Sequence, residues 1–279
     1  MKKYVALLLT MVLGVSMLAG CGQKAAENTP ADAEQTQERT KLVVGFDAEY
    51  PPYGYRNEVG EYVGFDLDLA AEVCVRRGWE LVKQPIEWDA KDMELNSGSI
   101  DCIWNGFTMT GREANYTFSD PYVDNSIVFV VRADSGIKTK ADLAGKVVMT
   151  QADSSALTAL TNEEDNEDNL ALAASFASLD QTGDYNSAFM NLEAGSIDAI
   201  AVDIGVAQYQ LNSRGELFTK LEEPLSTEQY AIGFKQGNTE LRDQVQETLY
   251  EMLEDGTLDK IAANYKDYNL DQMLCLGKE

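Results

Sequence analysis

The chain has 279 residues, of which 44% are hydrophobic and 25% charged, a composition typical of a folded globular protein with room for two modest cores. A formal net charge of −25 argues against nucleic-acid binding, because phosphate contacts require clustered lysine and arginine. The sequence contains no histidine, which excludes histidine-based catalytic triads and most zinc and iron sites.

The first forty residues have the pattern of an exported lipoprotein. Lys2 and Lys3 precede an apolar run over residues 4–18, which is too short to span a bilayer comfortably and is typical of a secretory signal peptide. The junction Leu-Ala-Gly-Cys at 18–21 resembles a bacterial lipobox, so we predict a signal peptide over residues 1–20 and acylation of Cys21. The alternative is an uncleaved signal anchor. Residues 21–40 lack apolar periodicity and are predicted to form a flexible tether.

Strands and helices are predicted to alternate along the first half of the remaining chain. We expect strands at 41–46, 80–83 and 100–104, helices at 65–77 and 91–96, and a Pro/Gly/Tyr-rich loop at 50–55. The helix at 65–77 is indicated by Phe65, Leu69 and Val73, which are four residues apart, and by Gly78 at its end.

The same alternation continues to the end of the chain. We expect strands at 126–131, 147–150 and 230–234, a helical turn at 141–146, and helices at 154–160, 184–194, 239–254 and 258–265. Residues 162–169 contain five acids and no bases and are predicted to be a solvated loop; a calcium site is the alternative, although the spacing fits no EF-hand. Together these elements predict an α/β fold with mostly parallel strands.

One nine-residue pattern occurs twice. Residues 95–103 (LNSGSIDCI) are matched by residues 192–200 (LEAGSIDAI), each predicting a helix end, a glycine cap and a strand. The copies are 97 residues apart, which favours two similarly built lobes over one large domain. A chance likeness between two common helix-to-strand junctions is the alternative.

Apart from Cys21 the cysteines are Cys74, Cys102 and Cys275, and none of them has metal-ligand spacing. Cys74 and Cys102 have apolar neighbours and are expected to be small buried residues, while a disulfide between two of the three stays open. No cofactor and no metal are predicted.

Polar and aromatic side chains follow four of the strands, where ligands bind in open α/β sheets. They are Asp47, Tyr50 and Tyr53 after the first strand, Asn105, Gly106, Thr108 and Arg112 after residue 104, Asp153, Ser154 and Ser155 after residue 150, and Asp203 after residue 202. An α-carboxylate is bound by arginine and helix N-terminal amides, an α-ammonium by a carboxylate and hydroxyls, and a side chain by aromatic faces. The set therefore predicts an amino-acid site. Each residue alone has a structural alternative, such as a surface ion pair for Arg112 or a helix cap for the serines.

At these residues the chain resembles the polar amino-acid solute-binding proteins of ABC importers, over about residues 41–265. The motifs that carry the resemblance are GFDAEYPPY at 45–53, VGFDLDLA at 63–70, GFTMTGR at 106–112, FSDPY at 118–122, DLAGK at 142–146, GSIDA at 195–199 and the turn at 255–257. The family implies a two-lobed, periplasmic-binding-protein-like fold of type II with two crossing segments, near 130–132 and 228–231. The first lobe would comprise residues 41–130 with 231–279, and the second residues 131–230.

Carried over by position, the resemblance assigns roles to the site residues. It makes Arg112 the clamp for the ligand carboxylate, Asp203 the partner of the ammonium group and Ser155 a donor at a helix start. Thr108, with the backbone of Asn105 and Gly106, would lie between the two charged ends. Tyr50 and Trp88 would stack on the ligand side chain, and Asp47 would recognise the end of that side chain. The chain departs from the family at Asp153, where glycine is frequent, at Trp104 and Asn105, where residues are smaller, and in a shorter interval from Thr108 to Arg112.

The resemblance implies a monomer, held at the membrane by its lipid, that closes on an amino acid and hands it to the importer's transmembrane subunits. Cystine, glutamine, histidine and basic amino acids all remain open as ligands, with Asp47 and Glu49 favouring a neutral polar or cationic tip. One alternative is an enzyme on the same fold, such as a dehydratase relative, with Asp47 or Glu49 as general acid or base. Another is a sensor that acts through a partner.

Overall fold

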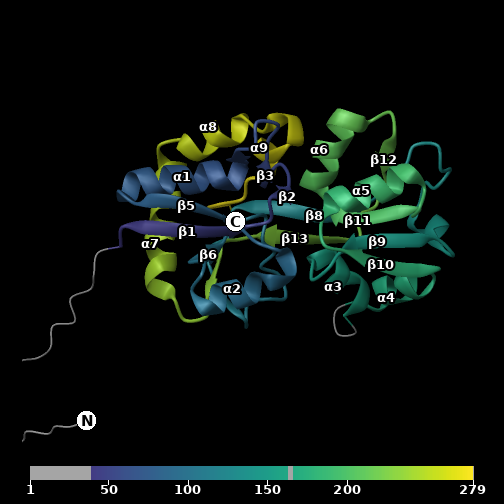
Figure 1. The fold of residues 1–279 in the computed structure, drawn as a ribbon, viewed down its shortest axis with the longest axis horizontal. Helices are drawn as coiled ribbons and strands as arrows, with labels where there is room; N and C mark the ends of the chain where they lie inside the picture. The colour runs from purple at the N-terminus through teal and green to yellow at the C-terminus, as the bar shows by residue number, and fades with distance from the viewer. Residues whose placement is uncertain (1–38, 163–165, 279) are drawn as a thin grey trace, which may run out of the picture. The chain divides into compact units, whose positions relative to one another are not determined.

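The computed structural model describes residues 39–162 and 166–278 (Figure 1). The predicted signal peptide, Cys21 and nearly all of the predicted tether lie outside the described residues. Within the described ranges, none of the helices has both the length and the apolar character that crossing a bilayer requires.

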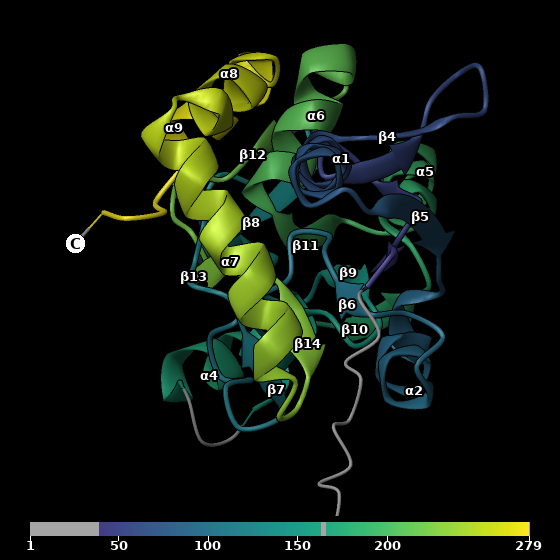
Figure 2. The same cartoon turned by 90° about the vertical axis from the view of Figure 1, so that its left-hand side faces the viewer.

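The first lobe is built on a five-stranded sheet that uses both ends of the described chain. Its strand order is β5 (Glu80–Pro85), β1 (Lys41–Phe46), β6 (Cys102–Ile103), β14 (Gly233–Lys235) and β7 (Tyr116–Phe118). β1 is parallel to β5 and β6, whereas β14 returns antiparallel to β6 and β7. Helices α1 (Phe65–Arg77) and α8 (Thr257–Ala263) lie on one side and α2 (Lys91–Ser97) on the other (Figure 1), while α7 (Thr239–Glu254) packs against α1 and β7 (Figure 2).

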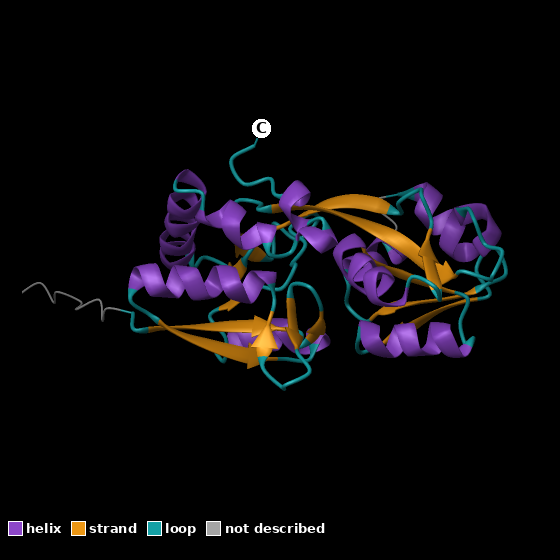
Figure 3. Cartoon of the chain, turned by 90° about the horizontal axis from the view of Figure 1, so that it is seen from above, coloured by secondary structure: helices purple, strands orange, loops and turns teal. Residues whose placement is uncertain are grey.

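The second lobe has a sheet of its own. Its strand order is β10 (Ser178–Thr182), β9 (Val147–Gln151), β11 (Ala199–Asp203), β8 (Val123–Arg132) and β12 (Phe218–Lys220), with β13 (Ser226–Tyr230) also paired to β8. Helices α3 (Ser155–Thr161) and α4 (Glu167–Ala174) lie on one side, and α5 (Tyr185–Ala194) and α6 (Ile204–Arg214) on the other (Figure 1). Seen from above, the strands form two groups, one toward each end of the molecule (Figure 3). Both sheets thus have helices on two sides, as the predicted alternation requires.

The chain passes between the two sheets twice, at residues 119–122 and 231–232, which confirms two lobes joined by two segments. Strands β8 and β13 pair antiparallel, from Val123 opposite Tyr230 to Ile127 opposite Ser226, and Leu274 bridges to Val123 beside them. The first passage comes earlier than the predicted 130–132, because β8 belongs to the second sheet from residue 123 onward. The division into lobes at residues 130 and 231 stays a prediction.

The repeated nine-residue pattern has the same structure in both lobes. Helices α2 and α5 end at left-handed caps, Gly98 with φ 81° and Gly195 with φ 73°. In each copy the following aspartate accepts a hydrogen bond from a neighbouring strand, Asp101 from the Val43 amide at 2.7 Å and Asp198 from the Val147 amide at 2.9 Å. The internal likeness therefore extends from sequence to hydrogen bonding.

Two predictions of loops need correction. The segment predicted as a loop at 50–55 has its turn at residues 51–53, but the residues on either side pair in a small antiparallel sheet of β2 (Glu49–Tyr50), β3 (Gly54–Arg56) and β4 (Tyr62–Val63). The acidic segment predicted as a loop at 162–169 contains the start of α4, because the Asn166 side chain caps the amides of Asp168 and Asn169 and acids favour a first turn. Helix α6 was not predicted.

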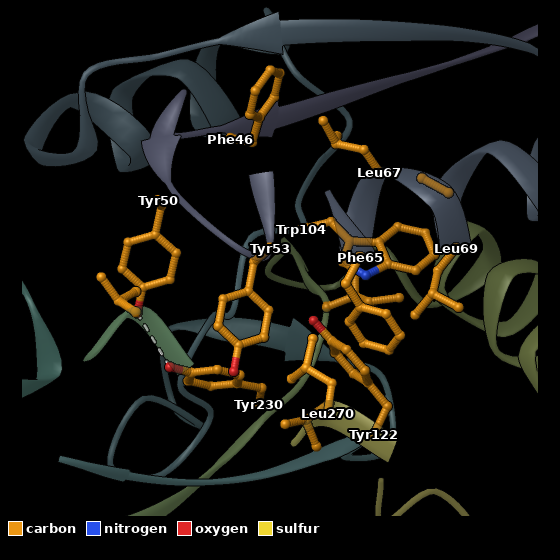
Figure 4. Packing of buried hydrophobic residues seen from close by; sticks show 14 of the residues in the cluster. Phe46, Tyr50, Tyr53, Phe65, Leu67, Leu69, Trp104, Tyr122, Tyr230 and Leu270 are labelled. Carbon is orange, nitrogen blue, oxygen red and sulfur yellow. Dashed lines mark hydrogen bonds between the residues drawn. The ribbon is translucent and has the colours of Figure 1, made fainter. Parts of the chain in front are cut away.

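The remaining short elements are α9 (Leu270–Met273) and 3₁₀ turns at Trp88–Ala90, Lys140–Leu143 and Lys266–Tyr268. Cys74, Cys102 and Cys275 are buried and free, so no disulfide joins them. Aromatic rings form much of the buried cluster near the lobe junction, where Tyr50, Tyr53, Tyr122 and Tyr230 converge (Figure 4).

Candidate functional site

Residues from both lobes enclose one small cavity. Its lining consists of Tyr50, Trp88, Gly106, Thr108, Arg112, Gln151, Ser154, Ser155 and Asp203, all of which except Gln151 are predicted ligand-binding residues. The cavity volume is about 10 Å³, which is the space of a single water molecule. An amino acid can therefore enter only if the lobes separate or the lining side chains move.

Arg112 provides the positive charge of the site. Its guanidinium lies 5.1 Å from the centre of the Phe107 ring, within the range of a cation–π interaction. Its hydrogen bonds to the carbonyl oxygens of Thr108 and Asp153 are long, at 3.5 and 3.4 Å, so they hold the group weakly. A carboxylate can replace them with shorter, charge-assisted bonds.

Asp203 provides the negative charge opposite. Its side chain is buried, and Oδ1 accepts hydrogen bonds from the Asn125 amide at 2.7 Å and from the Tyr230 hydroxyl. Because Tyr230 donates to Asp203, the 3.2 Å contact between the Tyr50 and Tyr230 hydroxyls has Tyr50 as donor (Figure 4). The relay from Tyr50 through Tyr230 fixes the orientation of the carboxylate.

Aromatic rings form the wall between these charges. Tyr50 and Trp88 are parallel within 3° with ring centres 6.5 Å apart, and Tyr185 on α5 approaches Tyr50 to 6.0 Å from the second lobe. Such faces can hold an aliphatic or aromatic side chain.

Asp47 lies behind the cavity wall and orients Gln151. The Gln151 Nε2 donates to Asp47 Oδ2 at 2.7 Å and to the Gly183 carbonyl at 2.9 Å, which leaves Oε1 as the acceptor atom of the amide. Burial raises the pKa of Asp47 to about 6, although hydrogen bonds from the Glu49 amide and Gln151 oppose the rise.

Three predicted ligand-binding residues do not line the cavity: Asp47, Tyr53 and Asn105. The Tyr53 ring packs edge-on against Tyr230, with centres 5.2 Å apart. The Asn105 Oδ1 accepts the Asp47 amide at 3.0 Å. In this structure these two side chains support the site and do not form its surface.

Gly106 is held by a buried carboxylate. Its amide donates to Asp66 Oδ2 at 2.6 Å, and Asp66, at the start of α1, is fully buried. A glycine is required here because its φ is +57° and a Cβ atom would lie 3.0 Å from the Tyr50 and Tyr230 rings.

Four residues in or beside the site were not predicted: Lys91, Asn125, Gln151 and Glu228. Lys91 was assigned only to a helix start, yet it pairs with Asp153 across the two lobes. Asp153 has φ +55°, a left-handed conformation that explains why glycine suits this position. Asn125 and Glu228 lie within strands, where no motif marks them, and only the β8–β13 register brings them together.

Among the described residues, no group of three or more acidic or cysteine side chains is placed to hold a metal ion.

Comparison with known proteins adds independent evidence. The family model described as bacterial extracellular solute-binding proteins, family 3, matches residues 42–268. The chain is 31% identical over 278 residues to the L-cystine-binding protein TcyA of Bacillus subtilis, covering 95% of this chain and 97% of the relative. It is 27% identical over 257 residues to the L-cystine-binding protein TcyJ of Escherichia coli K12, covering 91% and 92%. An ABC uptake transporter substrate binding protein from Streptococcus pneumoniae, solved with bound histidine, superposes with a TM-score of 0.76 at 32% identity, covering 81% of this chain and 92% of that one. The two-lobed fold of type II is thereby confirmed.

Proposed function

This chain belongs to the bacterial extracellular solute-binding proteins of family 3, and on that premise we propose that it closes its two lobes on an α-amino acid and presents it to an ABC importer. The observation that carries the proposal is that Arg112 of the first lobe and Asp203 of the second lie in the wall of one cavity. Arg112 would bind the α-carboxylate and Asp203 the α-ammonium. Only the closed arrangement satisfies both charges, so binding would favour closure.

The ligand side chain is proposed to end in a second positively charged nitrogen. Gln151 presents an acceptor oxygen, because Asp47 and the Gly183 carbonyl take both of its amide protons. Glu49 lies near Asp47 and accepts from Asn186 of the second lobe, so the acids at this end favour cations and disfavour glutamate or aspartate. The names of the relatives, which include binding proteins for cystine, and the solved complex with histidine are consistent with such a ligand.

A thermal-shift screen tests both proposals. The full chain, in mild detergent, is unfolded and refolded to remove any bound ligand and is then heated with each of the twenty amino acids and with L-cystine. A ligand at a hundred times its dissociation constant stabilises the protein by about 2.7 kcal/mol. We expect the melting temperature to rise with arginine, lysine, histidine or cystine and not with glutamate. A rise with glutamate alone would contradict the ligand class, and no rise at all would contradict amino-acid binding.

Attachment to the membrane through acylated Cys21 is the accompanying proposal, supported by the lipobox-like sequence at 18–21 and the extracellular character of the family. In a bacterial host given labelled palmitate, the wild-type chain should incorporate label and sediment with membranes, and Cys21→Ser should do neither. A labelled Cys21→Ser chain would refute the site. The anchored protein is proposed to act as a monomer and without bond making, with Asp47 orienting Gln151 rather than serving as a general acid.

A further inference from the structure

Glu228 occupies a position that joins both lobes and the strands between them. It lies on β13, two residues before the end of that strand, and only 9% of it is exposed. Its Oε1 accepts three hydrogen bonds, from the Thr108 hydroxyl at 2.7 Å, the Asn125 amide at 2.8 Å and the Ser155 hydroxyl at 3.2 Å. Thr108 belongs to the first lobe and Ser155 begins α3 of the second.

The direction of these bonds determines what Thr108 and Ser155 offer to a ligand. An ionised carboxylate only accepts, so each hydroxyl proton is directed at Glu228. Each hydroxyl oxygen can then accept a hydrogen bond from a ligand, but it has no proton left to donate to one. Because Thr108 and Ser155 both line the cavity, their oxygens are acceptors there. Such oxygens match an ammonium group, which has only donors, and do not match a carboxylate.

Asn125 links this arrangement to Asp203. Its Nδ2 donates to Glu228 Oε1 at 2.8 Å and to Asp203 Oδ1 at 2.7 Å, so one amide group spaces two buried carboxylates. Two buried carboxylates held this close together repel each other. Burial, and then the nearby Asp203, accordingly raise the pKa of Glu228 to about 7. An α-ammonium relieves that repulsion, whereas a neutral group in its place does not.

We propose that Glu228 is a positioning residue of the ammonium subsite, which holds the Thr108 and Ser155 hydroxyls as acceptors and so makes the site select α-ammonium over α-hydroxyl ligands. The inference rests on the proposed amino-acid-binding function and deepens it. Glu228 does not itself line the cavity; it lines a separate open groove of about 760 Å³ with Asn125, Asp124 and Gln229. Its effect on the ligand is therefore exerted through the two hydroxyls and through its charge.

The test compares L-arginine with argininic acid, the analogue in which a hydroxyl replaces the α-ammonium. Dissociation constants are measured by titration calorimetry on the refolded full chain at about pH 8, where Glu228 with its pKa of about 7 is mostly ionised, for the wild type and for Glu228→Gln. We expect the wild type to prefer L-arginine by about a hundredfold or more, because the analogue lacks the ion pair. In Glu228→Gln, arginine should bind about tenfold more weakly and argininic acid no more weakly, so the preference should shrink about tenfold.

Glu223→Gln is the matched control. It makes the same chemical change in the second lobe at a largely exposed residue paired with Lys140, and the preference should stay at the wild-type value. Equal weakening of both ligands in Glu228→Gln would overturn the assignment, since a residue that only maintains the fold would affect them alike. An unchanged arginine affinity would overturn it too. Failure of the wild type to bind any amino acid would instead refute the proposed function, and the assignment with it.

Discussion

The ammonium group of Lys91, at the start of α2 in the first lobe, is ion-paired with the carboxylate of Asp153, in the turn before α3 of the second lobe. The Lys91 side chain is 2% exposed and lies 5.0 Å from the Trp88 ring centre, so its charge is buried against a wall of the proposed ligand site. Burial lowers the pKa of Lys91, and pairing with Asp153 opposes that effect. A buried charge needs a partner, and Asp153 supplies it only while the lobes are together. The pair therefore stabilises the closed arrangement without any contribution from the ligand.

Replacement of either member should shorten the lifetime of the bound state. In Lys91→Met or Asp153→Asn we expect the dissociation rate of the bound amino acid to rise about tenfold, because one partner of a partly buried charge pair has gone. The association rate should change by less than about threefold, since encounter precedes closure. Stopped-flow fluorescence of the tryptophans, one of which is Trp88 in the site, can follow both rates.

The double variant and a surface pair complete this experiment. If Lys91 and Asp153 act together, the double variant should be no worse than the more affected single variant. Lys140→Met breaks an ion pair with Glu223 inside the second lobe and should leave both rates unchanged. Additive effects in the double variant would show that the two residues do not act as a pair.

Arg112→Ala should lose affinity only for ligands that have a carboxylate. We expect about a hundredfold weaker binding of L-arginine, because the variant leaves a desolvated carboxylate without its charged donor. Agmatine, which is arginine without the carboxylate, should bind the wild type and the variant with the same low affinity. Calorimetry with L-arginine and with agmatine, on the wild type and on Arg112→Ala, measures these affinities. A parallel loss for agmatine would mean that Arg112 maintains the fold of the site and does not bind the carboxylate.

The sequence was informative wherever local chemistry decides the structure. The helices at 65–77 and 239–254 are confirmed residue for residue, since each combines apolar periodicity with a capping residue or turn at its ends. Most residues that line the cavity were predicted as well, because they closely follow strands whose carboxyl ends meet between the lobes. The acidic segment before α4 was misread because its charges suggested a loop more strongly than Asn166 suggested a cap.

The residues that were missed depend on long-range pairing. Glu228 contacts Asn125 because β13 and β8 are antiparallel in one particular register, and a shift by one residue would turn Glu228 to the other face. Lys91 reaches Asp153 only because two lobes, each folded around its own sheet, meet at that point. No pattern within a short window of sequence contains this information.

Asp47 should make arginine binding depend on pH. Burial raises the pKa of Asp47 to about 6 from an ordinary value of 3.8, so the carboxyl is mostly protonated at pH 5 and mostly ionised at pH 7. Only the ionised form attracts a cationic side chain, so the affinity for L-arginine should increase from pH 5 to pH 7. Asp47→Asn should weaken L-arginine binding at pH 7. It should also remove the part of the increase in affinity that comes from ionisation of Asp47. Calorimetry at pH 5, 6 and 7 measures both effects.

Glutamine is the control ligand for Asp47, because its side chain ends in an N–H donor group, as that of arginine does, but is neutral. On Asp47→Asn substitution its affinity should change much less than that of arginine, and the pH dependence of its binding should stay as in the wild type. Equal losses for arginine and glutamine in Asp47→Asn would mean that Asp47 acts only by supporting Gln151. They would also remove the argument for a cationic side chain in the ligand.

Gly205 permits a close approach between the lobes. It lies in the first turn of α6 in the second lobe, and a Cβ atom there would be 2.5 Å from the Tyr53 hydroxyl oxygen and 2.8 to 2.9 Å from ring carbons. Tyr53 belongs to the first lobe and is fully buried, so its ring has no free space into which to turn. The backbone at Gly205 itself is compatible with alanine, because its φ lies outside the left-handed region. An added methyl group should therefore keep the lobes apart while each lobe remains folded.

Gly205→Ala should accordingly weaken amino-acid binding at least tenfold while the melting temperature of the ligand-free protein falls by no more than a few degrees. Gly183→Ala is the matched control, since Gly183 is also in the second lobe near the site but a Cβ atom there would meet nothing within 4 Å. Small-angle scattering with saturating ligand should show a larger radius of gyration for Gly205→Ala than for the wild type and Gly183→Ala. Wild-type affinity in Gly205→Ala would mean that the Tyr53 ring yields and that this contact does not limit closure.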